Sequence, residues 1–421
     1  MSDLQLFNAS AKERGLIDIV SQHEPALHPN EELVFGLGTA LHQAGLPSHR
    51  LESMLERVAI RLGVKVHSFS LPTGLLLCSE RAGLPVTMLI RLPPQATNLE
   101  KLRRLTVEAE ALARGSQPPD GALARIRALS ETPPRWGRGA CVLGFTLSAA
   151  AFSVFFGGGG RELLIATAVG LCVGLVALLY GNKRGANRRF ELAAAGVAGL
   201  IAGATDVYWI PLASGLIILL PGLALVDAIE ELANGHLVSG VAKAAGVGVV
   251  LLALIFGVLL AVNLEDLILG AGTTAETIAF PKWVAIPALG VVTLGSIFRF
   301  QARLKDWIWV FLASAVAFGG SRLGATLGNP LMGPFLGALL LGFGANLYAR
   351  LCHPTPQLLL VPGLALLVPG SFGLQSMNFM LSGDSMTGIE QGFQMFMAAI
   401  AIVAGLLFSN RLIKAESTRT T

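Results

Sequence analysis

Charged side chains are scarce in this sequence. Asp, Glu, Lys and Arg make up 14% of the 421 residues, whereas 53% are apolar and 49 are glycine. A typical soluble domain has about 25% charged residues, so this composition excludes an ordinary soluble protein and indicates a membrane protein. The charges are also unevenly distributed, because 29 of the 58 lie in the first 135 positions. We therefore expect a soluble front domain joined to an integral membrane body.

Cysteines are few and widely separated. The four are Cys78, Cys141, Cys172 and Cys352, with no Cys-x-x-Cys pair and no metal-ligand spacing. This excludes a disulfide framework and favours isolated, buried thiols. The amino-terminal stretch MSDLQLFNASAKERGLIDIV has no apolar core of the kind that a signal peptide needs, so we expect the front domain to stay in the cytoplasm.

Motifs for enzymes and ATP-driven pumps are missing as well. No Gly-x-x-x-x-Gly-Lys-Ser/Thr occurs in the chain, and residues 1–135 contain neither Gly-x-Ser-x-Gly nor His-Glu-x-x-His. We expect no catalytic residues, no cofactor, no metal and no nucleic-acid partner. The front-domain histidines form no ligand pattern and are interpreted as surface or structural residues; they are His23, His28, His42, His49 and His67.

Residues 1–135 have the patterns of an α+β domain. Apolar spacing predicts a helix over 51–62, with Ser48 as its N-cap. A second helix is expected from the cap Asn98 to about residue 114, and a last one after the loop 115–121. Between the first two helices lie three β-like runs, which are 64–70, 73–79 and 85–91.

Ten apolar stretches follow, each long enough or nearly so to cross a bilayer as a helix of about 20 residues. They are 139–156, 163–180, 190–205, 207–226, 241–263, 283–298, 307–320, 330–348, 357–373 and 392–409. We group them as a first five-helix repeat (139–264), an external linker (265–282), a second five-helix repeat (283–411) and a cytoplasmic tail (412–421).

The basic residues agree with this count. With the front domain inside, 13 Lys and Arg residues of the membrane body fall on the cytoplasmic side and 3 outside, as the positive-inside rule expects. Only Arg161, Lys282 and Arg322 lie outside. We predict a multi-pass protein of the plasma (inner) membrane with both termini in the cytoplasm.

The stretch PGLALVDAIEELANGHLVSG (221–240) returns 148 residues later as PGSFGLQSMNFMLSGDSMTG (369–388). Each copy ends the fourth span of a five-span group. Because five is odd, the second half must cross the membrane upside down relative to the first. Inverted repeats of this kind are typical of secondary transporters, whose substrate sites lie at interrupted helices.

A Pro-Gly pair interrupts a helix, and the backbone groups it frees are tolerated in a membrane only beside protein or a water-filled cavity. The candidates for substrate binding or gating are Pro221, Gly222, Asn234, Arg322, Pro369, Gly370, Ser371, Gln375 and Asn378. The candidates for proton coupling are Asp227, Glu230, Glu231 and His236. Two simpler interpretations stay open: residues 227–243 could be a solvated loop, and the matched glycines could serve only close packing.

Several of these segments together resemble the threonine/serine exporter family. They are AGLPSHRLESMLERVAIRLGV (44–64), LPTGLLLCS (71–79), the stretch 221–240, AIPALG (285–290), GGSRLG (319–324) and LVPGSFG (367–373). The resemblance runs from about residue 31 to 411. It implies a cytoplasmic domain, ten spans and proton-driven efflux of small polar metabolites, threonine and serine first.

Some relatives in that family resemble the same arrangement split into two subunits and are associated with succinate export. A dicarboxylate substrate favours an arginine in the site. Arg322 is the only well-placed arginine, and this scarcity mildly favours a zwitterionic amino acid over a dicarboxylate as the substrate. Two rival functions stay open, a passive channel and a membrane-tethered regulatory or enzymatic domain. The partners we expect are a small-molecule substrate, exchanged by antiport with protons, and the lipid bilayer, with homo-oligomerisation left open.

Overall fold

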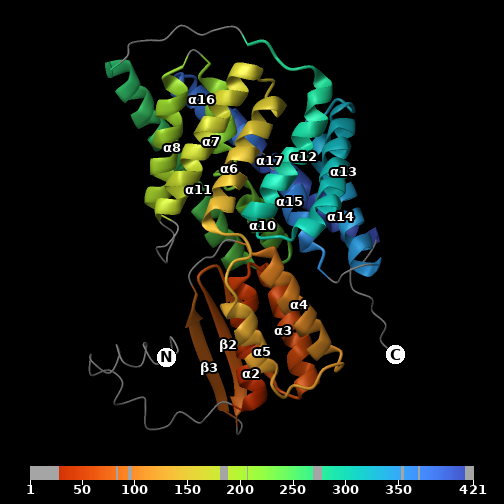
Figure 1. Cartoon of the computed structure of the whole chain (residues 1–421). Coiled ribbons are helices and arrows are strands. Elements are labelled where there is room, and N and C mark those ends of the chain that lie inside the picture. Colours follow the sequence, from red (N-terminus) through yellow and green to blue (C-terminus); the bar gives the residue numbers. More distant parts are fainter. Residues whose placement is uncertain are drawn as a thin grey trace, which may run out of the picture.

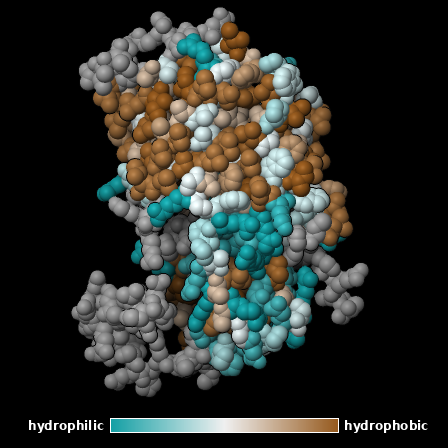
Figure 2. Space-filling model, viewed as in Figure 1, coloured by the Kyte–Doolittle hydropathy of each residue, from teal (hydrophilic) through white to brown (hydrophobic). Residues whose placement is uncertain are grey.

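The computed structural model describes residues 28–412 except 82–83, 93–96, 181–187, 206, 269–276, 352–354 and 368–369. A helical bundle stands on a smaller α+β domain, here called the front domain (Figure 1). On the face shown in Figure 2 the bundle surface is mostly hydrophobic and the front domain mostly hydrophilic. Leu164 and Leu252, on the bundle surface, are 72% and 67% exposed. An apolar surface of this extent is expected where a protein meets lipid.

The front domain contains four helices and one sheet within the described residues. The helices are α2 (Pro29–Gln43), α3 (Ser48–Leu62), α4 (Leu99–Ala113) and α5 (Ala122–Glu131). The strands are β1 (Val66–Leu71), β2 (Gly74–Arg81) and β3 (Leu84–Arg91), antiparallel in the order β1-β2-β3. The three predicted strands and the predicted helices after the sheet are confirmed.

Two details of the front domain differ from expectation. The sequence pattern assigned no element to α2, whose apolar residues are buried around most of the helix and so give no clear polar face. Ser48 is not the N-cap of α3, because Pro47 holds that position and Ser48 is the first helical residue. Its hydroxyl lies instead 3.2 Å from that of Ser239 in the bundle. The cap at Asn98 is confirmed, since its Oδ1 accepts a hydrogen bond from the Lys101 amide at 3.0 Å.

The bundle is built from twelve α-helices in the described residues. The first six are α6 (Arg138–Phe155), α7 (Gly160–Tyr180), α8 (Arg188–Gly203), α9 (Trp209–Leu216), α10 (Gly222–Ala233) and α11 (Leu237–Ile268). The other six are α12 (Ala285–Arg299), α13 (Trp307–Ala325), α14 (Met332–Leu351), α15 (Gln357–Leu367), α16 (Gly370–Leu381) and α17 (Ser385–Leu412).

Eight helical stretches in the described part of the chain are long and apolar enough to cross a membrane. They correspond to eight of the ten predicted spans, which supports a helical polytopic membrane protein. The two remaining spans are shorter: 190–205 corresponds to α8, of 16 residues, and 207–226 to α9 and the start of α10.

The two sets of six helices follow one order and one packing pattern. Helices α10 and α16 both have 12 residues and begin 148 positions apart. In the first set α8 packs on α11 and α10 on α11, and in the second α14 packs on α17 and α16 on α17. Figure 1 shows α10 at the end of the bundle next to the front domain and α16 at the opposite end.

Candidate functional site

The first predicted interruption lies between α9 and α10. Helix α9 ends at Leu216, and α10 starts at Gly222 after Pro221, which has φ −80° and ψ 41°. No side chain caps this start of α10. The first N–H groups of a helix have no partner within the helix, so the backbone amides at this break are available to another group.

The second interruption separates α15 from α16 and lies against the first. Pro369 is outside the described residues, as is the side chain of Ser371. Gly370 begins α16, and a Cβ built on it would lie 3.3 Å from Leu220 Cδ1 and 3.5 Å from Ile217 Cγ1. The two breaks are therefore neighbours in space, although 148 residues separate them in sequence.

The ends of α10 and α16 share one local geometry. Gly235 and Gly383 both have φ +86°, in the left-handed region that glycine adopts without strain. The amides of the next residues, His236 and Asp384, each donate to the carbonyl five residues earlier, at 2.9 Å in both copies. This is the Schellman pattern of a helix C-terminus, and it lets α11 and α17 fold back on the helices before them.

A second pair of glycines makes that return possible. A Cβ on Gly240 would lie 2.6 Å from the Leu232 Cγ, and one on Gly388 would lie 2.6 Å from the Met380 Cγ. Only a residue without a side chain fits between the two helices at these points. For this pair, close packing is confirmed as the role of the matched glycines.

The acidic end of α10 is packed against the front domain. Glu231 is fully buried (0% exposed). Its Oε1 accepts hydrogen bonds from Lys243 Nζ at 2.6 Å and from the backbone amide of Ser48 at 3.1 Å. The interpretation of residues 227–243 as a solvated loop is therefore wrong, because the segment is helical on both sides of one tight turn and its central acid is buried.

Two histidine–glutamate pairs cross the same contact in opposite directions. His49 Nε2 of the front domain lies 3.5 Å from Glu230 Oε1, and His236 Nε2 of the bundle lies 3.0 Å from Glu52 Oε2. The two imidazole rings are 6.3 Å apart, edge to face. We call the set Ser48, His49, Glu52, Glu230, Glu231, His236 and Lys243 the junction cluster.

Burial and neighbouring charges shift the pKa of four groups at this contact, which all lie outside the eight candidate membrane helices: His49, Asp227, Glu230 and Glu231. Burial lowers the pKa of His49 to about 4, and burial raises the pKa of Glu230. Burial also raises the pKa of Asp227, one turn earlier on α10, to about 7. For Glu231 burial acts upward, but the Lys243 ammonium and three hydrogen bonds outweigh it and hold the pKa below its usual range.

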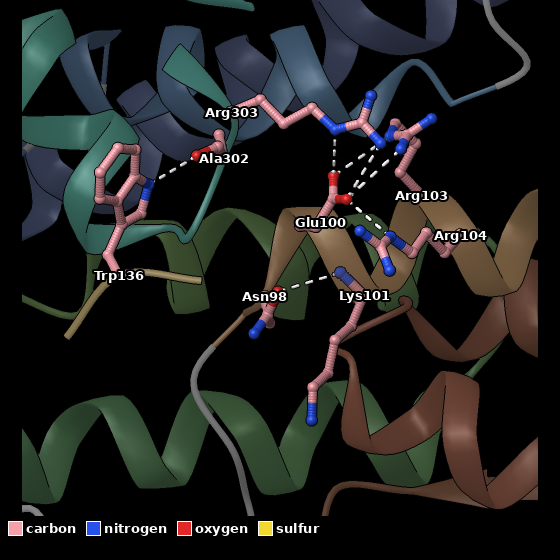
Figure 3. A network of polar contacts seen from close by, with 8 residues as sticks. All are labelled: Asn98, Glu100, Lys101, Arg103, Arg104, Trp136, Ala302 and Arg303. Carbon is pink, nitrogen blue, oxygen red and sulfur yellow. Dashed lines mark hydrogen bonds and ion pairs between the residues drawn. The ribbon is translucent and has the colours of Figure 1, made fainter. Parts of the chain in front are cut away.

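A second contact joins the front domain to the short loop between α12 and α13. Figure 3 shows Glu100 of α4 facing three guanidinium groups. Arg303 of that loop donates to both carboxylate oxygens, at 2.8 and 3.0 Å. Arg103 and Arg104, on α4 itself, bind the same carboxylate, which is only 8% exposed. A buried bidentate pair of this kind is a strong and geometrically specific contact.

Backbone and indole hydrogen bonds complete that second contact. The Leu99 amide donates to the Phe300 carbonyl at 2.9 Å. The Trp136 indole donates to the Ala302 carbonyl at 2.7 Å (Figure 3). The backbone amide of Trp136 donates to Gln301 Oε1 at 2.8 Å. Gln301 has φ +57°, which is unusual for a residue with a side chain. These bonds hold the loop in a defined shape against the front domain.

The other predicted site residues do not join the junction cluster. Asn234 ends α10 and uses its Nδ2 to bond the Glu230 carbonyl at 2.7 Å. Arg322 is exposed at the end of α13, with its guanidinium 5.1 Å from the Phe318 ring. Gln375 is exposed and Asn378 half-buried on α16. The titratable residues of the first copy thus lie on and just after α10 and the amides of the second copy on α16, and these two helices run to opposite ends of the bundle (Figure 1).

Comparison with known families identifies the chain. One family model, described as a threonine/serine exporter (ThrE), matches residues 32–265. A second, "Threonine/Serine exporter, ThrE", matches residues 284–412. The first alone covers more than half of the chain. The chain belongs to the threonine/serine exporter family. The two family models match successive parts of one chain, which is therefore the fused form of these membrane exporters, as the resemblance implied.

Curated relatives of this family member are distant. It is 23% identical over 330 residues to the threonine/serine exporter of Corynebacterium glutamicum, covering 74% of this chain and 66% of the relative. It is 25% identical over 384 residues to pheromone-regulated membrane protein 10 of Candida albicans (strain WO-1), covering 86% of this chain and 34% of the relative. The chain thus spans from about one third to about two thirds of the length of these relatives. No solved structure matches it.

The sequence alone did not reveal that residues of the front domain belong to the junction cluster of this family member. Ser48 and Glu231 are 183 residues apart, and His49, interpreted as surface or structural, pairs with Glu230 of the bundle. No local spacing could reveal such contacts. Within the described residues no group of three or more His, Cys, Asp or Glu can hold a metal ion.

Proposed function

We propose that the chain is a secondary exporter of small polar metabolites, threonine and serine first, that exchanges them for protons by alternating access. Membership of the threonine/serine exporter family supports this assignment, and the related Corynebacterium protein carries that name. The chain lies in the plasma (inner) membrane with the front domain and both termini in the cytoplasm.

In this proposal the halves 139–264 and 283–411 are inverted repeats. The equal lengths of α10 and α16, their shared C-terminal geometry and their positions at opposite ends of the bundle support it. Each half has five spans, the fourth of which is broken at a Pro-Gly pair. Rocking of one half against the other around the paired breaks would then expose the site to each side in turn.

The substrate site lies where the two breaks adjoin, beside Leu220 and Gly370. This contact between the breaks carries the proposal. Helices α10 and α16 both start there, so the positive ends of two helix dipoles face one region. Free backbone amides at a helix N-terminus bind anions, and a substrate carboxylate would take that place. Pro221, Gly222 and Gly370 shape the site in this scheme.

Asp227 is the proton carrier in this scheme. It lies five residues after Gly222, about 7.5 Å along the helix axis, which makes it the first titratable group of α10 after the break. Its raised pKa, about 7, allows it to exchange protons near neutral pH. Glu231, in contrast, is held in its charged form by Lys243 and fastens the front domain to the bundle.

The test is efflux of radiolabelled threonine, serine and succinate from vesicles containing the purified protein, with and without an imposed pH gradient. We expect threonine and serine to move against their own gradients only when the pH gradient is present. Movement that never goes uphill would indicate a passive channel, and movement of succinate alone would overturn the amino-acid assignment.

A further inference from the structure

A cleft of about 590 Å³ opens between the front domain and the bundle. One wall is a single face of α3, because His49, Glu52, Glu56 and Ile60 recur at spacings of three and four residues. The other wall is formed by residues 64–68, which lead into and include the first residues of β1, and by His236 of the bundle. The cleft is thus lined mainly by the front domain, and His236 is the lining residue that the bundle contributes.

The lining of the cleft carries charges of both signs. Two carboxylates, of Glu52 and Glu56, face one ammonium group, of Lys65, and three imidazoles. In the part of the chain that the structure describes, Glu56 and His67 have no hydrogen-bond or ion-pair partner. Among the same residues Lys65 is bound only to Glu80, in an exposed pair at 3.0 Å that a ligand can replace at little cost.

The lining also contains apolar side chains. Ile60 is 72% exposed although it is a large hydrophobic residue, and Val64 also lines the cleft. Exposed apolar surface rimmed by polar groups is typical of a ligand site. A ligand that matches the cleft has a cationic group, an anionic group and a small side chain, and it carries no net negative charge, because the lining has one more carboxylate than ammonium group.

We infer that this cleft is a cytoplasmic binding site for a small zwitterion, an α-amino acid of the class that the protein exports. The ligand's ammonium group binds Glu56, its carboxylate binds Lys65 and His67, and its side chain packs on Ile60. The choice of an amino acid rests on the proposed function, whereas the exclusion of dianions rests on the charge of the lining alone.

Occupancy of the cleft is linked to the contact between the front domain and the bundle. His49 and Glu52, on the face of α3 that lines the cleft, are also the residues that hold Glu230 and His236. Because His236 of the bundle lines the same cleft, the docked arrangement offers a seated ligand a contact that the undocked one lacks, and the ligand shifts the equilibrium toward docking. The site is thus placed to report cytoplasmic substrate to the exporter.

The experiment is hydrogen exchange, followed by mass spectrometry, of the full chain in lipid nanodiscs with L-threonine or succinate. We expect threonine to slow exchange in peptides covering 49–60 and 64–68, and succinate to have no effect. In Glu56→Gln the threonine concentration for half-maximal protection should rise about tenfold or more, because a charged hydrogen bond is lost. Glu131→Gln, an exposed acid on α5 outside the cleft, is the matched control and should behave as wild type.

Two results would overturn the inference: no threonine protection in these peptides of the wild type, or equal protection in Glu56→Gln. Vesicle efflux of threonine by the same preparation separates this failure from that of the proposed function. Efflux without protection refutes the cleft site alone. Protection without efflux refutes the exporter assignment and leaves the cleft site standing.

Discussion

The contact between Glu100 and Arg303 offers the sharpest test of how the front domain is held. The substitution Glu100→Gln keeps the shape of the side chain and removes its charge. Arg303 then loses a bidentate partner across the contact, at 2.8 and 3.0 Å. Arg103 and Arg104 also lose their carboxylate, but both lie on α4 with Glu100, so their loss affects the docked and undocked states alike.

The size of the effect follows from burial. Removing one partner of a buried ion pair costs about 3–5 kcal/mol. Arg303 is one-third exposed, so water recovers part of that cost for its guanidinium. We therefore expect the free energy of docking to become less favourable by about 2 kcal/mol. This corresponds to about a 30-fold increase in the fraction of molecules in which this contact is open.

Hydrogen exchange at the second contact measures this population directly. The Leu99 amide is bonded to the Phe300 carbonyl across the contact, so its exchange requires that the contact open. We expect peptides that contain Leu99 to exchange about 30-fold faster in Glu100→Gln. Glu108→Gln is the control, because Glu108 pairs with Arg125 inside the front domain. Wild-type exchange in Glu100→Gln, or the same acceleration in the control, would refute the reasoning.

Three further predictions concern the breaks and the junction cluster. Asp227→Asn should abolish gradient-driven efflux and leave the melting temperature near that of wild type, because only a proton-exchanging group is lost. Docking should weaken as the pH falls from about 6.5 to about 4. Burial holds the pKa of His49 near 4 in the docked state, whereas the imidazole of the undocked state binds protons within that pH window. Hydrogen exchange of the α3 amides, corrected for their intrinsic exchange rates, measures this loss of docking. Gly240→Ala and Gly388→Ala should each lower stability by about 1–3 kcal/mol, seen as a lower melting temperature, because a Cβ there meets a packed side chain at 2.6 Å.

Each of these has its own check. Uphill efflux that persists in Asp227→Asn would remove that residue from proton coupling. His49→Gln should flatten the acid-side loss of docking; a loss of the same size in that variant would assign the pH dependence to another group. Gly246→Ala, on α11 with nothing within 4 Å of the added Cβ, is the control for the glycine pair and should be neutral. If it destabilised as much as Gly240→Ala, the packing argument would fail.

Local patterns predicted most of the secondary structure because the signals are local. The alternation of residues 64–91 and its turns indicated three strands, and the Asn98 cap marked the start of α4. Long apolar runs indicated the bundle helices, since lipid selects apolar side chains along a whole helix. The return of Pro-Gly after 148 residues indicated matched breaks, and the matched left-handed glycines Gly235 and Gly383 show the same repetition in the backbone.

The role of the acidic segment could not be predicted in this way. Asp227, Glu230 and Glu231 are similar carboxylates within two turns of one helix, and nothing in their sequence distinguishes them. The structure pairs Glu231 with Lys243 and Ser48, sets Glu230 beside His49, and raises the pKa of Asp227 by burial. Their partners come from segments far apart in the chain.

By itself the sequence determined the kind of protein, its helices and strands, the two breaks and the family, because these depend on composition, on short-range periodicity and on the order of motifs. Only the tertiary structure decided that Gly370 lies against Leu220, that α3 and α4 fasten the front domain to the bundle, and that a cleft of mixed charge opens between them. Those features depend on which surfaces meet when distant segments pack, and the meeting of surfaces leaves no periodic signal in the chain.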